Sequence, residues 1–360
     1  MIHVVLLVVC AVVIYLACEW FVNAVEWLGV RMKVGAIAVG TILAAAGTAL
    51  PESVVTLVAV LFGSAEHGDD VAVGAALGGP LVVGTIAYGV TGAMLLWKRH
   101  QNARQAEVEL VHAGASAARS GAASHGTASA AAGGGPFAGV DLRRLGRDQT
   151  WFLAIFSVKV ALGLVAFAFK PWLGLVFFAA YAVYFVKEMT GGGDHASADG
   201  LEPLKLQRRR TVPATWAVLT QTVATLVVIF VASQVFVTQI EWAGPAMGLP
   251  TTVVALLLAP VATELPEILN AIIWVRQGKV GLALANISGS MMIQATVPSG
   301  IGLLATPWLF TFPLLLAGLV TMAAIGYLLL LLRTGKITTG RLAGTAAFYG
   351  LFALVLGLTL

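Results

Sequence analysis

Two acidic residues stand three positions apart in a long apolar stretch of this 360-residue chain. Glu264 and Glu267 occur in the segment 262–267, Ala-Thr-Glu-Leu-Pro-Glu, inside the apolar run 251–275. Residues three or four apart share one face of a helix, so the side-chain oxygens of Thr263, Glu264 and Glu267 are predicted to point together. A charged side chain at the centre of a bilayer costs at least about 2.5–3.5 kcal/mol. These acids therefore require a proton, a counter-ion or a bound cation.

The composition places these acids in a multi-pass membrane protein. Apolar residues make up 59% of the chain and charged residues only 11%, against roughly 25% charged residues in soluble domains. The two cysteines, Cys10 and Cys18, indicate neither a disulfide framework nor a metal cluster. Stretches long enough to cross a bilayer predict an all-α fold of ten spans, at 3–28, 35–62, 71–97, 151–169, 171–188, 213–242, 248–275, 280–304, 308–332 and 342–360.

The distribution of positive charge predicts the orientation of these spans. Nineteen of the 21 Lys and Arg residues lie in or directly beside the loops that follow odd-numbered spans. Because Lys and Arg gather on the cytoplasmic side, both termini are predicted to lie outside the cell. We expect the chain in the cell membrane, which is the inner membrane where a cell has two. No nucleic-acid-binding module is evident.

An internal repeat relates the two halves of the chain. Residues 26–52, shifted by 215 positions, match residues 241–267 at 11 of 27 positions without a gap. Each half holds five predicted spans, so the second half enters the membrane from the opposite side, as in transporters with inverted repeats. The predicted parts are a first repeat at 1–97 and 150–188 with its motif at 40–80, a flexible cytoplasmic loop at 98–149, a cytoplasmic linker at 189–212, and a second repeat at 213–360 with its motif at 255–295.

The repeat pairs Glu52 with Glu267 and Thr48 with Thr263. Antiparallel repeats would bring the two acidic turns together near the bilayer centre, where carboxylates, hydroxyls and free carbonyls form an all-oxygen site. Hard cations such as Ca²⁺ and Na⁺ prefer that environment. The next span adds further polar candidates, of which Asn286 is as well suited to an interhelical hydrogen bond as to an ion; Ser290 is included in the predicted site and Gln294 is a weaker candidate.

The two motifs resemble the paired α-repeats of the cation/Ca²⁺ exchanger superfamily, the Na⁺/Ca²⁺ exchangers and their prokaryotic relatives. They are the segments 47–52, Gly-Thr-Ala-Leu-Pro-Glu, and 262–267. The resemblance covers both halves and implies ten helices in two inverted five-helix repeats. It also implies that Glu52 and Glu267 are central Ca²⁺ ligands, that Thr48 and Thr263 contribute oxygens, and that spans 1 and 6 slide across the other helices.

The chain departs from this family pattern at several positions. Ser is usual where this chain has Ala49 and Glu264, and the family's asparagine positions carry Ala75 and Pro80 in the first half and Asn286 and Met291 in the second. The first half has thus lost side-chain oxygens, while the second has gained a carboxylate. The predicted site is asymmetric, with up to three acids, which leaves Na⁺ and H⁺ both open as coupling ions.

The sequence therefore predicts a secondary active antiporter, not an enzyme, that moves Ca²⁺ or a similar cation in exchange for Na⁺ or H⁺ and carries no cofactor. Two alternatives are an exchanger-derived ion sensor or scaffold, and a lipid-acting membrane enzyme. The oligomeric state stays open, a monomer included. Glu26, beside a Trp at a span end, is expected to reach water at the interface, with a gating role as the alternative. Lys159 lies inside a span with no partner assignable from sequence.

Overall fold

The computed structural model describes a chain of helices joined by short connections. It describes residues 2–62, 68–120, 136–137, 139–190, 201–246, 257 and 259–359, and within these ranges some side chains, including those of Glu52 and Glu241, are outside the description. Every described element is a helix, which confirms the all-α prediction. In chain order they are α1 (Ile2–Met32), α2 (Ala36–Ala38), η1 (Val39–Ala44), α3 (Ala45–Phe62), α4 (Gly68–Val82), η2 (Val83–Ala87), α5 (Tyr88–Ser120), α6 (Leu142–Leu162), α7 (Leu173–Thr190), η3 (Lys205–Gln207), α8 (Thr215–Ala246), α10 (Ala259–Thr263), α11 (Leu265–Arg276), α12 (Val280–Ala305), α13 (Phe312–Arg333), α14 (Thr339–Ala343) and α15 (Ala346–Thr359).

Seven helical stretches among the described residues are long and apolar enough to cross a bilayer. Each overlaps one of the ten predicted spans. The other three predicted spans, at 35–62, 151–169 and 248–275, overlap described helices that are not among these seven. The structure thus agrees with an integral membrane protein, while the number ten, the inverted repeats and the side on which the termini lie stay predictions.

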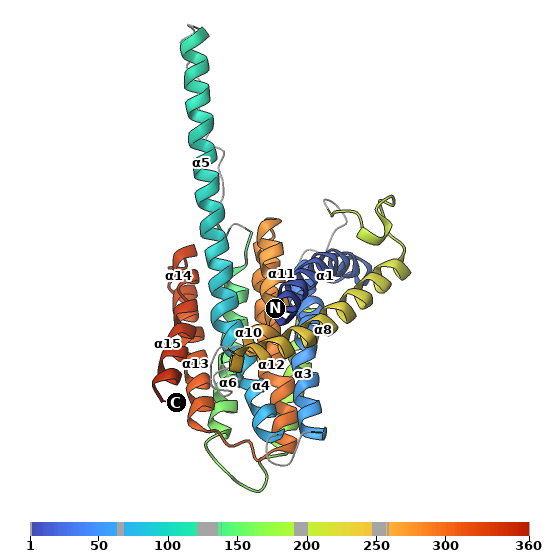
Figure 1. Ribbon diagram of the computed structural model, residues 1–360, viewed down its shortest axis with the longest axis vertical. Helices are drawn as coiled ribbons and strands as arrows, with labels where there is room; N and C mark the ends of the chain where they lie inside the picture. The colour runs from blue at the N-terminus through green and yellow to red at the C-terminus, as the bar shows by residue number, and fades with distance from the viewer. Residues whose placement is uncertain are drawn as a thin grey trace.

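Helix α12 runs through the middle of the bundle, where α3, α4, α6, α7 and α11 pack against it (Figure 1). In the most apolar 18-residue stretch of α12, 83% of the residues are buried, the highest share among the seven candidate spans. Its sequence explains this position, because Gly, Ala and Ser residues let neighbouring backbones come close. The polar residues of α12 are therefore held inside the bundle, away from lipid.

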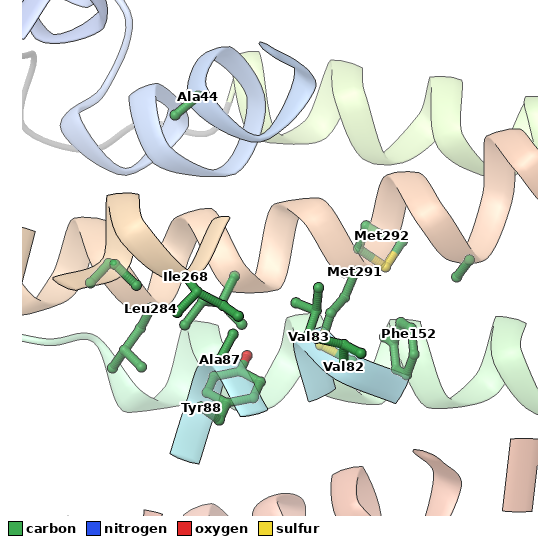
Figure 2. Packing of buried hydrophobic residues seen from close by; sticks show 14 of the residues in the cluster. Ala44, Val82, Val83, Ala87, Tyr88, Phe152, Ile268, Leu284, Met291 and Met292 are labelled. Atoms are coloured by element: carbon green, nitrogen blue, oxygen red, sulfur yellow. The ribbon is translucent and has the colours of Figure 1, made fainter. Parts of the chain in front are cut away.

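The core around α12 also accounts for one departure from the family pattern. Met291 occupies one of the positions at which the family that the motifs resemble is expected to carry asparagine. Figure 2 shows Met291 beside Val82 and Val83, on the side of α12 that faces the end of α4 and the start of η2. It is fully buried, so this position contributes apolar packing between helices.

Both repeated motifs lie next to irregular helix geometry. The first follows η1, a stretch of π-helix that leads directly into α3 with Thr48 and Glu52. The second is interrupted at Glu264, which separates α10 from α11. Irregular backbone at membrane depth is tolerated where it is buried in protein or faces a cavity, so the helix geometry distinguishes both motifs from the regular helices around them.

The structure differs from the loop predicted at 98–149. Helix α5 continues to Ser120 and extends well beyond the bundle, and α6 begins at Leu142 (Figure 1). The segment from 98 to 112 is rich in Arg, Gln, Glu, Ala and Leu, all good helix formers, and the glycines that suggested a flexible loop begin only at 114. The intervening residues 121–135 are outside the described part.

The fourth predicted span also ends earlier than the sequence suggests. Residues 151–169 were expected to be continuous, but α6 ends at Leu162, and Gly163 caps it. The backbone N–H of Phe310 donates to the Gly163 carbonyl at 3.0 Å, and the aromatic ring of Phe310 lies where a Cβ at position 163 would be. The close approach of another segment therefore stops this helix, and hydropathy alone does not reveal such a contact.

Helices α1 and α8 pack along each other at one side of the bundle, inclined to the other helices (Figure 1). The end of α11 and the turn that follows it hold α1 in place through Glu26, which accepts hydrogen bonds from Trp274 Nε1 at 2.9 Å and from Lys279 Nζ at 2.6 Å. Glu26 is only 7% exposed. Its carboxylate thus binds the turn between α11 and α12, where the sequence suggested contact with water.

Substituting Gly289 with alanine is expected to lower the melting temperature by a few degrees. A Cβ at this position would lie 2.1 Å from the Thr41 carbonyl oxygen in η1, a backbone atom that cannot move aside. Overpacking of this kind typically costs about 1–3 kcal/mol. Thermal unfolding of the purified chain, followed by tryptophan fluorescence, measures the effect. Gly326→Ala is the matched control because its Cβ would meet open space; equal melting temperatures for the two variants would contradict the packing described.

Candidate ion-binding site

Glu264 sits at the break between two short helices of the second motif. Its backbone N–H still donates to the Pro260 carbonyl at 3.1 Å, and its own carbonyl accepts from Ile268 N–H at 3.2 Å, so it serves as the N-cap of α11. The side chain is fully buried. Its Oε1 accepts a hydrogen bond from Gln294 Nε2 of α12 at 2.7 Å.

Glu267 lies in the first turn of α11 and is also fully buried. The positive end of the helix dipole favours a carboxylate at this place. Ser290 Oγ of α12 donates to Glu267 Oε1 at 3.5 Å. The Thr48 side chain of α3 is fully buried and its hydroxyl donates to the Ala44 carbonyl at 3.1 Å. Helix α3 packs against α11, so the first motif lies against the helix that carries the acid of the second.

The other predicted site residues have different surroundings. Thr263 is partly exposed and its hydroxyl donates to the Pro260 carbonyl of its own helix at 3.1 Å. Asn286 is fully buried on α12, and neither polar atom of its side chain has a partner among the described residues. The backbone of Glu52 belongs to α3, but its side chain lies outside the description.

The structure adds residues to this group that the sequence ranked low or missed. Gln294 contacts Glu264 directly. Gly79 of α4 leaves the space that the Glu264 carboxylate fills, since a Cβ there would lie 2.6 Å from Oε1. Asn270 is fully buried with both side-chain polar atoms unpaired among the described groups. Its position one turn after Glu267, on the same helical face, is the signal that could have indicated it.

Unpaired buried oxygens concentrate in this region. Among the described side chains, those without a hydrogen-bond partner include Glu264 Oε2, Glu267 Oε2, Asn286 Oδ1 and Gln294 Oε1. Leaving a buried polar atom unpaired costs about 1–3 kcal/mol, and more for a charged group. Carboxylate and amide oxygens are the ligands that Ca²⁺ and Na⁺ take, so the set fits a hard cation as substrate. Among the described side chains, no three His, Cys, Asp or Glu residues lie close enough together to hold a metal ion. The Glu52 side chain is not among those described.

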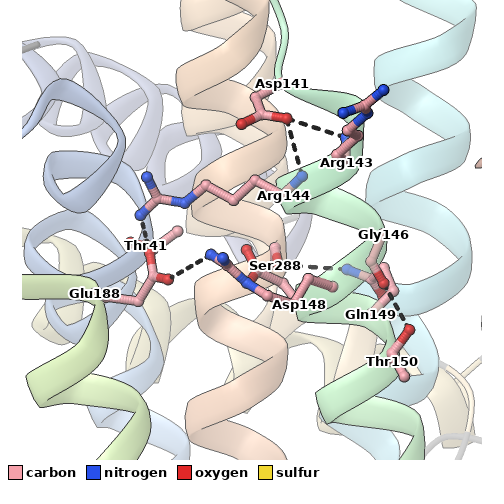
Figure 3. Close-up of polar contacts among 11 residues, drawn as sticks. Thr41, Asp141, Arg143, Arg144, Gly146, Asp148, Gln149, Thr150, Glu188 and Ser288 are labelled. Atoms are coloured by element: carbon pink, nitrogen blue, oxygen red, sulfur yellow. Dashed lines mark hydrogen bonds and ion pairs between the residues drawn. The ribbon is translucent and has the colours of Figure 1, made fainter. Parts of the chain in front are cut away.

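A second polar cluster lies at the end of the bundle where α6 begins (Figure 3). Arg144 and Arg147 of α6 both form ion pairs with Glu188 of α7. The Arg147 Nη2 to Glu188 Oε1 distance is 3.5 Å. Thr41 of η1 donates to Glu188 Oε2 at 3.2 Å. This network therefore ties the π-helical entry of the first motif to α6 and α7. A cavity of about 330 Å³ beside it is lined by residues that include Ile37, Asp141, Arg144, Asp148, Lys279 and Ala285.

Asp148, in this second cluster, is expected to make the stability of the chain depend on pH. Burial, reinforced by the Glu188 charge and only partly offset by Arg144 and Arg147, raises its pKa to about 7. A folded-state pKa above the unfolded value stabilises the folded chain at low pH, and this stabilisation is lost as the pH rises through about 7. At roughly 1.4 kcal/mol per pKa unit, the stabilisation lost is about 4 kcal/mol.

The substitution Asp148→Asn should remove that dependence. We expect the variant to melt at a higher temperature than the wild type at about pH 8 and to lose the advantage toward about pH 4. Melting temperatures measured across this range check the sign. Glu202→Gln, at an exposed position, is the control that should follow the wild type. An Asp148→Asn curve parallel to the wild type would show that the carboxyl group is ionised throughout.

The family described as sodium/calcium exchanger protein matches residues 2–187 and 217–358, which is most of the chain. The chain belongs to this family. Membership indicates that the exchanger is an integral membrane transport protein and not an enzyme.

Individual relatives agree with this assignment. The exchanger is 28% identical over 171 residues to a protein named "Putative antiporter CaxA" from Alkalimonas amylolytica, in a match that covers 46% of this chain and 52% of that one. The match thus spans about half the length of that curated relative.

Solved structures of the sodium-calcium exchanger NCX_Mj share the fold. One, from crystals soaked with 2.5 mM Na⁺ and 0.1 mM Ca²⁺, superposes with a TM-score of 0.69 at 16% identity over 98% of this chain and 97% of the other. Another, soaked with zero Na⁺ and Ca²⁺, gives a TM-score of 0.68 at 16% identity over 98% of each chain. At this identity the likeness concerns the fold of the exchanger alone.

Proposed function

We propose that the chain is a secondary active antiporter that carries Ca²⁺ or a similar cation across the membrane in exchange for Na⁺ or H⁺. The observation that carries the proposal is that the two motifs meet inside the bundle: α3 with Thr48 packs against α11 with Glu267, and both side chains are fully buried. Family membership and the name of the antiporter relative support it. Ten spans in two inverted repeats, with both termini outside the inner membrane, complete the proposed architecture.

The site in this proposal is built from seven residues. Glu52 and Glu267 are the central ligands, Glu264 is a third acid, and the remaining oxygens come from Thr48, Thr263, Asn286 and Ser290. The unpaired oxygens of Glu264, Glu267 and Asn286 support this set. Thr263 would have to contribute its backbone carbonyl or turn its hydroxyl away from Pro260, since the hydroxyl donates to that residue's carbonyl.

Energetics require a coupling ion. Moving two charges against 100 mV costs roughly 4.6 kcal/mol, at about 2.3 kcal/mol per charge, and a gradient of Na⁺ or H⁺ would supply it. Alternating access in the proposal arises from α1 and α8, which pack on each other at the side of the bundle, moving together past the remaining helices. That motion would separate Glu26 from Lys279, which gives Glu26 the gating role that the sequence left as an alternative.

The test is Ca²⁺ flux into proteoliposomes that contain the purified chain, with Na⁺ or H⁺ gradients imposed separately. Uptake driven by either gradient, and absent from protein-free vesicles, is the expected result and identifies the coupling ion. Ca²⁺-dependent quenching of tryptophan fluorescence without any gradient-driven flux would contradict the antiporter and favour the ion sensor.

A further inference from the structure

Lys159 is a buried cation that the proposed transport site does not use. It lies on α6 with no exposed surface. Its ammonium donates to the backbone carbonyls of Ala76 at 2.6 Å and Gln294 at 3.5 Å, and it lies 4.7 Å from the centre of the Phe156 ring. No ion pair of Lys159 occurs within the described part of the chain. The amine inside the bundle is thus held by neutral groups from three helices.

The backbone carbonyls of Ala76 and Gln294 are free to accept from Lys159 for the same reason. In a helix the carbonyl of residue i accepts from the N–H of residue i+4. Position 80 in α4 and position 298 in α12 are both proline, and proline has no N–H to donate. The carbonyls of Ala76 and Gln294 are therefore released by Pro80 and Pro298, on two different helices, and point at one ammonium group.

Carbonyl oxygens released in this way are ligands for monovalent cations in membrane transporters. The pair at Lys159 is therefore a small cation site whose occupant is covalently attached to the chain. It lies next to the proposed transport site, because Gln294 accepts from Lys159 through its backbone and donates to Glu264 through its side chain at 2.7 Å.

We propose that Lys159 is a tethered substitute for a monovalent cation, which fills the site between the Ala76 and Gln294 carbonyls and reduces by one the mobile cations that this region binds. The second part of this proposal rests on the proposed function, since it concerns the acids of the transport site. A purely structural lysine would join α4, α6 and α12 equally well, so the deciding measurement has to be cation binding.

The experiment compares the full chain with Lys159→Met in detergent, in Ca²⁺-free buffer, by following the melting temperature as NaCl or KCl replaces choline chloride at constant ionic strength. Methionine keeps the length and apolar stem but leaves both carbonyls unpaired. We expect the variant to gain stabilisation by Na⁺ or K⁺, with an apparent affinity at least about tenfold tighter than in the wild type. No gain would overturn the proposal.

Two further variants separate the carbonyl site from a general effect of charge. Adding Pro298→Ala to Lys159→Met supplies an N–H for the Gln294 carbonyl, so the gained response should disappear; if it persists, the carbonyl site is refuted. Lys159→Arg keeps the charge and should respond as the wild type does, and a gain in that variant would also overturn the proposal. If Lys159→Met proves too unstable, Lys159→Leu, which also has no donor, must show the same gain.

These measurements are made at equilibrium and do not depend on transport. Failure of the Lys159 variants to gain cation binding would leave gradient-driven Ca²⁺ flux by the wild type unaffected. Conversely, a wild type without Ca²⁺ flux, together with a clear gain in Lys159→Met, would refute the antiporter and retain the tethered cation.

Discussion

Replacing Glu267 with glutamine is expected to abolish gradient-driven Ca²⁺ uptake into proteoliposomes. The carboxylate is fully buried at the start of α11, and one of its oxygens has no partner among the described groups. Glutamine preserves the shape and one acceptor oxygen but removes the charge that a divalent cation needs in a site with little water. A loss of at least about 100-fold in uptake rate, equivalent to about 2.7 kcal/mol, is expected.

The same variant should fold normally. Replacing a buried charge by a neutral group of the same shape removes a desolvation cost, so the melting temperature without Ca²⁺ should be equal or higher, while the rise on adding Ca²⁺ should vanish. Glu202→Gln makes the same chemical change at an exposed position and should transport as the wild type does. Uptake by Glu267→Gln at the wild-type rate would remove Glu267 from the proposed site. Glu52→Gln is expected to match Glu267→Gln.

Replacing Glu264 with serine, the residue usual in the related family, should weaken Ca²⁺ binding and change how transport depends on pH. This acid exists only in the second motif, and its carboxylate occupies the space left by Gly79 and contacts Gln294. Loss of one charged ligand is expected to lower the apparent Ca²⁺ affinity at least about tenfold, or about 1.4 kcal/mol. The Na⁺ and H⁺ dependence of uptake, measured from about pH 6 to about pH 9, reports the change in coupling.

Glutamine at position 264 is the matched control for this experiment. Glu264→Gln keeps the side-chain volume and an oxygen that can accept from Gln294, so it separates the effect of charge from the effect of an empty space beside Gly79. Both variants should shift the pH profile if the carboxylate is a ligand or a proton carrier. A profile and a Ca²⁺ affinity equal to those of the wild type would mean that Glu264 only packs the helices together.

The sequence predicted the helical membrane fold and the residues at its centre because both follow from local patterns. Long apolar stretches indicated the spans, and the repeated Thr and Glu around a proline indicated Thr48 and Glu267, which are both buried on helices that pack together. The early end of α6 and the apolar packing of Met291 depend on groups from other helices. No pattern within either segment predicts those contacts.

Two polar residues illustrate the limit of the sequence analysis at the site. Gln294 ranked below Asn286 as a ligand from sequence, yet Gln294 is the one that contacts a predicted acid, because α12 turns it toward Glu264. Lys159 had no partner assignable from sequence, although Pro80 and Pro298, which release its two carbonyl acceptors, were visible there. Only the assembled bundle shows that the two prolines and the lysine belong together.

The proline-released carbonyls also constrain biosynthesis. Ala76 precedes Lys159 by 83 positions, and Gln294 follows it by 135, so the ribosome completes α4 long before the chain can satisfy the carbonyl that Pro80 exposes. An unpaired carbonyl in contact with acyl chains is costly, which favours keeping the newly made α4 beside the insertion machinery until α6 emerges. Nascent α6 in turn carries an amine that finds its second acceptor only when the last third of the protein is translated. Final docking of these helices is therefore a late event, after nearly all of the polypeptide has left the ribosome.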